Sequence, residues 1–291
     1  MGIRAVITLS LLGAAAAGTV DYILRKRPRH VRLIAGSTAF LLPFGAYALL
    51  SPAGLLGTKP ETTFLFITDT HGPAADNVKL VQAMLRESNV NFVIHGGDIA
   101  DTEDLWRAWW DTPFSQVIAK WPVYPTRGNH DPEAGYRQRF PNSWPPYKLS
   151  FGSVDIFFVP YLSVPAANGS TGAAVANWLQ RETAFHSAPF KILVTHRPIW
   201  RAQGSEGDNL ATLFAASLPR IDLILAGHNH VFQDSSRVIG DRIVRQVIEK
   251  SGPKNYTCNS GAAGCVERST GYLRVTVSAD QISVERRQVG L

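Results

Sequence analysis

Short apolar runs, each followed by a cluster of polar residues, recur through residues 58–291. Runs of this length, bounded by turn residues, are typical of buried strands. The strands predicted in this way are residues 64–67, 92–94, 123–124, 191–195 and 221–225. Helical patterns at 77–86 and 102–120 separate the first three runs, and such strand–helix–strand alternation implies parallel pairing.

The remaining pattern of this region predicts antiparallel strands as well. Residues 147–151 and 155–159 flank Gly152-Ser153 and indicate a hairpin. A helix is expected near 173–185, and further strands are expected at 243–248, 272–277 and 282–286, of which the last two fit a terminal hairpin. We therefore predict an α/β fold, a four-layer α/β/β/α sandwich of two mixed sheets flanked by helices.

Two long apolar runs, residues 5–24 and 33–50, distinguish residues 1–57 from the rest of the chain. Each run approaches the ~20 residues that a membrane-spanning helix needs. The basic stretch between them, residues 25–32, should stay on the cytoplasmic side of a membrane. We therefore predict an N-terminal membrane helical hairpin or anchor at 1–57. The folded domain at 58–291 should then face away from the cytoplasm at an inner or plasma membrane.

Two other interpretations of this N-terminal region stay open. The first apolar run also fits a cleaved signal peptide, since Arg4 and the small residues at 14–17 match that outline. The basic cluster behind the run argues against its easy translocation. A soluble helical hairpin packed on the domain is the other alternative.

The formal charge of +6 is concentrated in the same N-terminal region. Residues 1–57 contain six Lys or Arg and one acidic residue, a net of +5. Residues 58–291 contain 23 basic and 22 acidic side chains, a net of +1. Because a domain that grips polynucleotide backbones usually has a basic excess of its own, the sequence argues against a nucleic acid partner.

The two cysteines, Cys258 and Cys265, lie in a stretch of small residues that can turn the chain back on itself. A disulfide between them would require an oxidising compartment, which the predicted orientation supplies. Two unrelated free thiols are an equally good interpretation of the sequence. A thiolate metal site is disfavoured, since no histidine or further cysteine lies nearby.

Histidine and carboxylate residues are concentrated in the polar clusters, which hold five of the eight histidines. In chain order the clusters are Asp69-Thr70-His71, Gly97-Asp98 with Asp101, Gly128-Asn129-His130-Asp131, His196 and Gly227-His228-Asn229-His230. In an open α/β sheet, loops beyond the carboxyl ends of the strands converge. The sequence therefore predicts that imidazole and carboxylate groups meet at one place, as in a catalytic metal site.

The order of these clusters resembles the calcineurin-like metallophosphoesterase family over about residues 62–235. The resemblance implies two divalent metal ions, with Mn, Fe and Zn as equally suitable candidates. The ligands that it implies are Asp69, His71 and His230 for the first ion, Asn129, His196 and His228 for the second, and Asp98 as the bridge between them. No ligand of the family pattern is missing.

The resemblance also implies a mechanism, in which a hydroxide shared by the two metals attacks phosphorus in line with the leaving alcohol. His130 would protonate or stabilise the leaving oxygen, and Asp131 and Asp101 would orient imidazoles. Purple acid phosphatases, which are also similar at His196-Arg197-Pro198, place a tyrosine three residues after the bridging aspartate. Asp101 stands at that position here, so a tyrosinate-bound ferric ion is not expected.

Several other residues admit two interpretations. His95 is either a packed strand histidine, which we favour, or a further site residue. Arg127 and Arg197 flank metal motifs and fit either a substrate phosphate or a structural salt bridge. The tryptophans at 106, 109 and 110 share one helical face and predict core packing, with a substrate cap or a lipid contact as the alternative.

Together the patterns and the resemblance predict a membrane-tethered, metal-dependent hydrolase of small phosphate esters. A phosphodiesterase or pyrophosphohydrolase that acts on lipid-linked or nucleotide substrates is the main alternative. A non-catalytic metal-binding scaffold would be expected to lack a ligand or the acid histidine, and neither is lost in this sequence.

Overall fold

The computed structural model describes residues 61–185, 188–200, 209–255, 257–258, 265–267 and 270–290, without the side chains of residues 76, 164 and 165. The predicted membrane hairpin at 1–57 lies outside these residues and stays a prediction. Among the residues that are described, no helix is both long and apolar enough to cross a membrane.

Within the described chain, five strands form a first sheet in the order β12-β11-β1-β2-β3. They are β1 (Thr62–Ile67), β2 (Phe92–His95), β3 (Val123–Pro125), β11 (Gly271–Val277) and β12 (Ile282–Gln288). As predicted, β1, β2 and β3 are parallel, with Phe64 opposite Phe92. β11 and β12 form the predicted terminal hairpin and extend β1 antiparallel, so the sheet is mixed.

A second sheet holds seven described strands in the order β10-β8-β9-β7-β6-β5-β4. They are β4 (Tyr147–Phe151), β5 (Val154–Val159), β6 (Phe190–Thr195), β7 (Leu223–Ala226), β8 (Phe232–Ile239), β9 (Arg242–Ile248) and β10 (Cys265–Val266). β5, β6, β7 and β9 run parallel, whereas β4, β8 and β10 pair antiparallel with their neighbours. This sheet is mixed as well.

The central strands β1, β2, β5 and β7 are buried on two faces, and β1 shows why this produces layers. Phe64 and Phe66 point into a core between the two sheets, where they join apolar residues of β5, β6 and β7. Leu65 and Ile67 alternate to the other face and pack against the helices. A strand with helices on one side and a second sheet on the other is apolar throughout, since neither face meets water.

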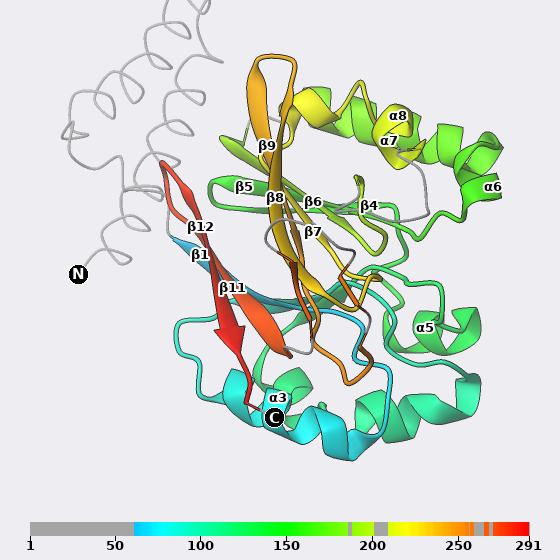
Figure 1. Cartoon of the computed structure of the whole chain (residues 1–291), viewed down its shortest axis with the longest axis vertical. Coiled ribbons are helices and arrows are strands. Elements are labelled where there is room, and N and C mark those ends of the chain that lie inside the picture. Colours follow the sequence, from blue (N-terminus) through cyan, green and yellow to red (C-terminus); the bar gives the residue numbers. More distant parts are fainter. Residues whose placement is uncertain are drawn as a thin grey trace, which may run out of the picture. The chain divides into compact units, whose positions relative to one another are not determined.

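Helices cover the outer face of each sheet (Figure 1). On the first sheet lie α3 (Ala74–Leu85), η1 (Glu103–Leu105), η2 (Arg107–Asp111), α4 (Ser115–Lys120) and α5 (Glu133–Arg139). Beside the second sheet lie α6 (Val164–Ala167), α7 (Ser170–Phe185), α8 (Asn209–Leu213) and η3 (Leu218–Arg220). The prediction of two mixed sheets flanked by helices is confirmed.

The predicted single helix at 102–120 is wrong, because three short segments (η1, η2 and α4) replace it. Pro113 explains the last interruption, since proline lacks a backbone N–H and clashes with the carbonyl four residues before it. The Thr102 hydroxyl donates to Asp104 at 2.6 Å instead of capping a helix. Trp106 and Trp110 are buried as predicted, within the core between the first sheet and its helices, whereas Trp109 is only half-buried.

Strand β8 was not predicted, because its sequence from Gln233 to Arg237 is polar and carries no alternating apolar face. It pairs with β9 through Asp234 opposite Val247, and much of it is half-buried or exposed. Its hydrogen bonds to β9, rather than burial, account for its strand conformation.

Candidate metal centre

The predicted ligands follow five parallel strands of the two sheets at the same edge. Asp69 and His71 come after β1, Asp98 after β2, and Asn129 after β3. His196 follows β6, and the pair at 228 and 230 follows β7. The carboxyl ends of parallel strands share one edge of a sheet, so this topology brings residues distant in sequence together.

One group of ligand atoms consists of Asp69, His71, Asp98 and His230, all buried and all within 4.8 Å of one another. Asp69 Oδ1 lies 3.7 Å from His230 Nε2, and Asp98 Oδ2 lies 3.9 Å from His71 Nε2. These separations exceed hydrogen-bond distance, but one cation can bind all four groups from between them.

A second group consists of Asp98, His196 and His228, to which Asn129 adds an amide oxygen. Asn129 Oδ1 lies 3.1 Å from His196 Nε2 and 3.0 Å from His228 Nδ1. The Asp98 carboxylate is therefore shared by both groups, as the family resemblance implies for a bridging ligand. The donors are imidazole nitrogens and carboxylate or amide oxygens, a set that suits divalent transition metals.

His71 provides the sharpest test of whether a cation fits. Its Nδ1 lies 2.5 Å from Asp101 Oδ1, and because a carboxylate only accepts, Nδ1 carries the hydrogen. The lone pair is then on Nε2, which is buried and has no hydrogen-bond partner. A buried acceptor that faces two carboxylates without a donor is unfavourable unless a cation lies between them.

His196 is also oriented through Nδ1, which donates to the carbonyl of Gly96 at 2.9 Å. Unlike His71, it has partners at Nε2, which lies 3.2 Å from Asp98 Oδ2 and 3.1 Å from Asn129 Oδ1. Burial on its own lowers the pKa of His196, but the charge of Asp98 outweighs it and raises the pKa to about 9. A cation bound between the two groups would take the place of that extra proton, since metal ligands bind in their deprotonated form.

Burial sets the protonation of the other ligands. It lowers the pKa of His228 and of His230 to about 3, so both imidazoles are neutral near pH 7 and available to a metal. Burial also raises the pKa of Asp69, and the neighbouring charge of Asp98 adds to that rise. Two carboxylates this close repel one another, which is the charge pattern that divalent cations stabilise.

Four ligands have a left-handed backbone, an uncommon conformation outside glycine. The φ angles are 54° at Asp69, 58° at Asp98, 70° at His228 and 48° at His230. Such conformations cost of order 1–3 kcal/mol each and persist where the surroundings impose them, often at functional sites. Among the described residues, only Asn89 shares this conformation outside the ligands and the glycines, so the left-handed backbone is concentrated at the ligands.

Gly128 shows how closely the loops approach. A Cβ atom on Gly128 would lie 2.1 Å from Asp98 Oδ1, well inside van der Waals contact. The glycine therefore lets the loop after β3 pass over the shared carboxylate, where the His130 amide also donates to Asp98 Oδ1 at 2.9 Å.

The remaining predicted residues occupy different places. His130, whose side chain is 43% exposed, directs Nδ1 at Asp101 Oδ1 at 3.2 Å on the open side of the centre. Asp131 is buried and accepts from the backbone amides of Gly128 and of residues 98–100, at 2.6 to 3.2 Å. Its hydrogen bonds therefore shape the loops after β2 and β3, whereas the family resemblance implies that it orients an imidazole.

The structure also places His95, Arg127 and Arg197, for which the sequence allows two interpretations. His95 is fully buried, accepts from the Gly97 amide at Nδ1 and contacts Thr70 at 2.9 Å through Nε2, so it is a packed strand histidine as favoured. Arg127 donates to the carbonyl of Asp131, and the buried Arg197 donates to the carbonyl of Leu162. Both arginines hold backbone in place.

Lys254 is the residue that sequence reasoning missed. Its Nζ lies 3.3 Å from Asp101 Oδ2 and 3.2 Å from His71 Nδ1, beside the first ligand group. The signal was present, because Lys254 follows the predicted strand at 243–248, which runs parallel to β7 and ends at the same edge. Lys254 lies beyond the last family motif, which ends at His230.

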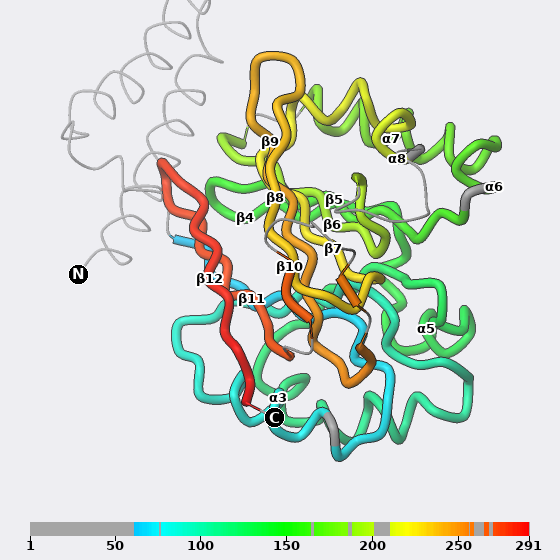
Figure 2. Tube along the Cα trace, in the orientation of Figure 1, coloured from blue at the N-terminus to red at the C-terminus, as the bar shows by residue number. Residues whose placement is uncertain are grey.

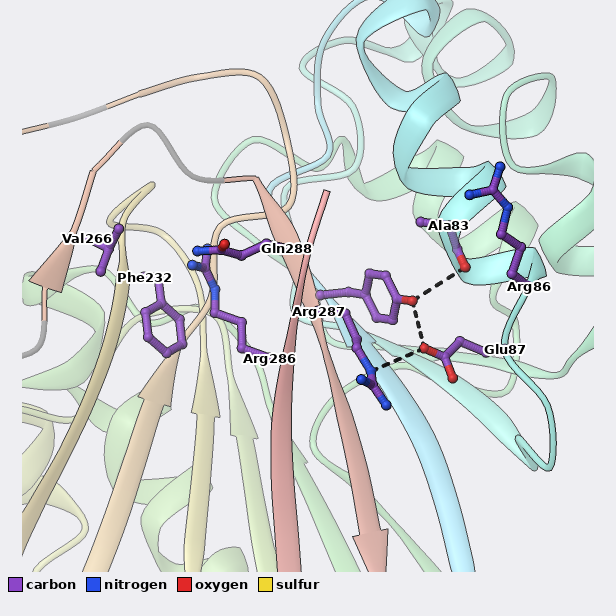
Figure 3. Close-up of a pocket in the computed structure, with 9 residues that line it drawn as sticks. Ala83, Arg86, Glu87, Phe232, Val266, Arg286, Arg287 and Gln288 are labelled. Atoms are coloured by element: carbon purple, nitrogen blue, oxygen red, sulfur yellow. Dashed lines mark hydrogen bonds and ion pairs between the residues drawn. The ribbon is translucent and has the colours of Figure 1, made fainter. Parts of the chain in front are cut away.

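A groove of about 730 Å³ at the edge of the first sheet contains none of the predicted site residues (Figure 3). Arg287 points toward Glu87 at 3.5 Å, and the Tyr272 hydroxyl donates to Glu87 at 2.7 Å. Arg286 stacks on the ring of Phe232 and binds the buried Glu249 at 3.0 Å. These contacts join strands β11 and β12 to their neighbours.

The motifs and the fold agree with the comparisons to known proteins. The sequence model of the calcineurin-like phosphoesterase family matches residues 62–232, more than half of the chain and every predicted ligand. The chain belongs to this family. Among curated protein sequences, none matches significantly.

Two solved structures illustrate the shared fold. Purple acid phosphatase PPD1 from yellow lupin (Lupinus luteus) seeds superimposes with a TM-score of 0.58 at 14% identity, over 80% of this chain and 52% of that chain. A structure of PhoD gives a TM-score of 0.57 at 13% identity, over 80% of this chain and 72% of that one. This chain thus spans about half the length of the lupin enzyme, and at these identities the likeness shows the fold alone.

Proposed function

We propose that this chain hydrolyses phosphate esters with two divalent metal ions. The observation that supports it best is the Asp98 carboxylate, which belongs to both groups of candidate ligands. When bound, two such cations lower the pKa of a shared water and hold the phosphate oxygens. The family match supports phosphoester hydrolysis, and the pair of ligand groups supports a dinuclear centre.

The site has two parts with different roles. We call the buried ligands Asp69, His71, Asp98, His196 and His230 the floor, and the more exposed residues Asp101, His130 and Lys254 the rim. The buried ligands hold their positions through hydrogen bonds to fixed groups, as His71 does with Asp101 and His196 with Gly96. His130 stands at the exposed rim with Nδ1 toward Asp101, so its Nε2 is the nitrogen that can give a proton to a leaving oxygen. Asp131 supports the loop that carries His130.

The proposed substrates are small phosphate esters, and the proposed metals are Mn, Fe or Zn. Asp101, in the position of the tyrosine ligand of purple acid phosphatases, contacts two imidazoles and argues against a purple ferric centre. Hydrolysis of diesters, pyrophosphates or lipid-linked phosphates is the second candidate, supported by the proposed membrane tether.

We also propose that residues 1–57 anchor the protein, with the domain outside the cytoplasm. The disulfide between Cys258 and Cys265, which the structure contains, supports this placement because disulfides persist in oxidising compartments. Protease added to spheroplasts should then degrade the domain and spare the basic loop at 25–32. A domain protected from the protease until the membrane is lysed would contradict the orientation.

The test of the activity uses the full chain purified in detergent. Metal analysis should find about two transition-metal ions per chain. An aryl phosphate and a bis-aryl phosphodiester, assayed with added Mn, should distinguish a monoesterase from a diesterase. An active preparation that contains no transition metal and ignores chelators would refute the proposal, and a metal-loaded preparation inactive on both would favour a scaffold.

A further inference from the structure

The loop after β9 reaches the metal centre from outside the matched family segment, which ends at residue 232. β9 pairs parallel with β7, from Leu223 opposite Arg245 to Ala226 opposite Ile248. The tube in Figure 2 follows β9 beside β7 and β8. Residues 249–254 therefore leave the sheet at the edge where His228 leaves it, beyond the segment that the family model matches.

Buried charges fix the start of this loop. Glu249 is fully buried and accepts from Arg286 at 3.0 Å, while its amide donates to the carbonyl of Ala226 at 3.0 Å. The Lys250 ammonium, buried as well, donates to Thr270 at 3.1 Å. A buried ion pair with these additional partners is costly to disrupt, so the first residues of the loop are held in a fixed position.

The loop then lies along the segment that carries the first two ligands. The Thr68 amide donates to Ser251 Oγ at 3.2 Å. At Gly252, a Cβ atom would lie 1.8 Å from the carbonyl oxygen of Asp69. Pro253 is so close to Gly72 that a Cβ on that glycine would lie 2.6 Å from the proline ring. Such packing gives Lys254 a defined position.

Lys254 and His130 contact the same carboxylate. Asp101 Oδ1 faces His130 Nδ1 at 3.2 Å, and Asp101 Oδ2 accepts from Lys254 Nζ at 3.3 Å. The Lys254 side chain is 39% exposed, and an ammonium group has three donors, of which Asp101 uses one. A positive charge therefore stands beside the proposed general acid, on the open side of the centre.

We infer that Lys254 binds a negative charge carried by the leaving group of the substrate. The inference rests on the proposed function and narrows the substrate class to phosphoric anhydrides and to esters whose leaving group is itself phosphorylated. In the reaction, a water molecule first loses a proton to solvent, and the resulting hydroxide oxygen bonds to phosphorus while the bond from phosphorus to the leaving oxygen breaks. The leaving oxygen keeps the electron pair and takes a proton from His130, which is then reprotonated from solvent. Lys254 neutralises the adjacent charge and transfers no proton.

The test compares two substrates on the metal-loaded full chain. The leaving group of p-nitrophenyl phosphate is a phenol with no further anionic group. When ADP is attacked at its terminal phosphorus, the leaving group is AMP, whose phosphate is negatively charged. Lys254→Met should lower kcat/KM for ADP by about 10–100-fold, the range for losing one charge-assisted hydrogen bond. The kcat/KM for p-nitrophenyl phosphate should change by less than about 3-fold, because its leaving group offers Lys254 no charge to bind. Lys254→Arg should retain most of the wild-type preference for ADP over p-nitrophenyl phosphate.

A binding measurement gives a readout independent of turnover. Calorimetry with imidodiphosphate, a diphosphate with a nitrogen bridge, should show the same 10–100-fold weakening in Lys254→Met, while inorganic phosphate binds nearly as before. Metal content and melting temperature should stay at wild-type values because the side chain is partly exposed. Lys79→Met, at an exposed position on α3, is the matched control and should alter none of these quantities.

Two outcomes separate the inference from the function on which it rests. Equal losses on both substrates and both probes would mean that Lys254 acts only through Asp101, which overturns the inference and leaves the hydrolase intact. Wild-type protein that binds no metal and hydrolyses neither substrate would overturn the proposed function itself. Calorimetry in which wild type and Lys254→Met bind imidodiphosphate equally would also overturn the inference.

Discussion

Five of the candidate ligands (Asp69, His71, Asp98, His196 and His230) are buried and form the floor of the centre. The other two ligands are more open, since His228 is half-buried and Asn129 is exposed, and the rim (Asp101, His130 and Lys254) is partly open to solvent. Three of the five floor residues have left-handed backbones, so the fold imposes their geometry at a cost. The rim residues have no such strain and contact one another through a single carboxylate.

This contrast separates two requirements of the site. Metal ligands need fixed positions and a dry setting, which burial and tight loops provide. A group that meets substrate needs access from solvent and polar atoms left for the ligand. Variants of the floor should therefore change metal content, and variants of the rim should change catalysis with the metal retained.

Asp98→Asn should have the largest effect. Asparagine tolerates the left-handed backbone at this position, so the substitution removes charge with little added strain. Losing a partner outside the ligand shell typically costs about 10–100-fold in metal affinity or activity, and the shared ligand should cost more than that. Metal analysis should show fewer than two ions per chain, and kcat/KM should fall beyond the same range.

Asp241→Asn, in the exposed turn between β8 and β9, is the matched control because it makes the same chemical change away from the centre. Its metal content and activity should equal those of wild type. Retention of two metals and full activity by Asp98→Asn would show that the floor does not share a ligand, and the comparison of floor with rim would lose its basis.

His130→Ala should have the next largest effect, and on catalysis alone. General acids typically contribute about 10²–10⁴-fold, so kcat should fall within that range while metal content stays at the wild-type level. A substrate with a good leaving group needs less protonation, so the loss should shrink for p-nitrophenyl phosphate relative to an alkyl phosphate. An emptied metal site in His130→Ala would place this histidine among the ligands and contradict its rim assignment.

The sequence was sufficient to predict that most of the floor residues lie close together. Apolar runs that end in polar clusters located β1, β2, β6 and β7, and parallel strands share an edge, so the convergence of residues such as Asp69 and His196 followed. The family order supplied the two ligand groups. Short buried strands are the easiest elements to recognise in an α/β sequence because both of their faces are apolar.

Other features depended on contacts that a local pattern does not contain. Pro113 and the π-helical segment around Trp110 divided a continuous helical pattern. β8 is held by pairing with β9, which its polar sequence does not reveal. Lys254 approaches Asp101 across 153 residues, and only the parallel pairing of β9 with β7 places it there. The role of Asp131 likewise came from which amides surround it.

Removal of the disulfide should have the smallest effect on catalysis and should act on the rim side. Cys258 and Cys265, seven residues apart in sequence, connect the segment after Lys254 to β10. Closing a loop this short stabilises by about 2–3 kcal/mol in the chain-entropy view, so the double serine variant should lose that much in guanidinium unfolding. The floor has its own contacts, so metal content should not change. The preference for ADP over p-nitrophenyl phosphate should weaken, because Lys254 loses part of its support. Loss of metal in the double variant would instead show that floor and rim fold as one unit.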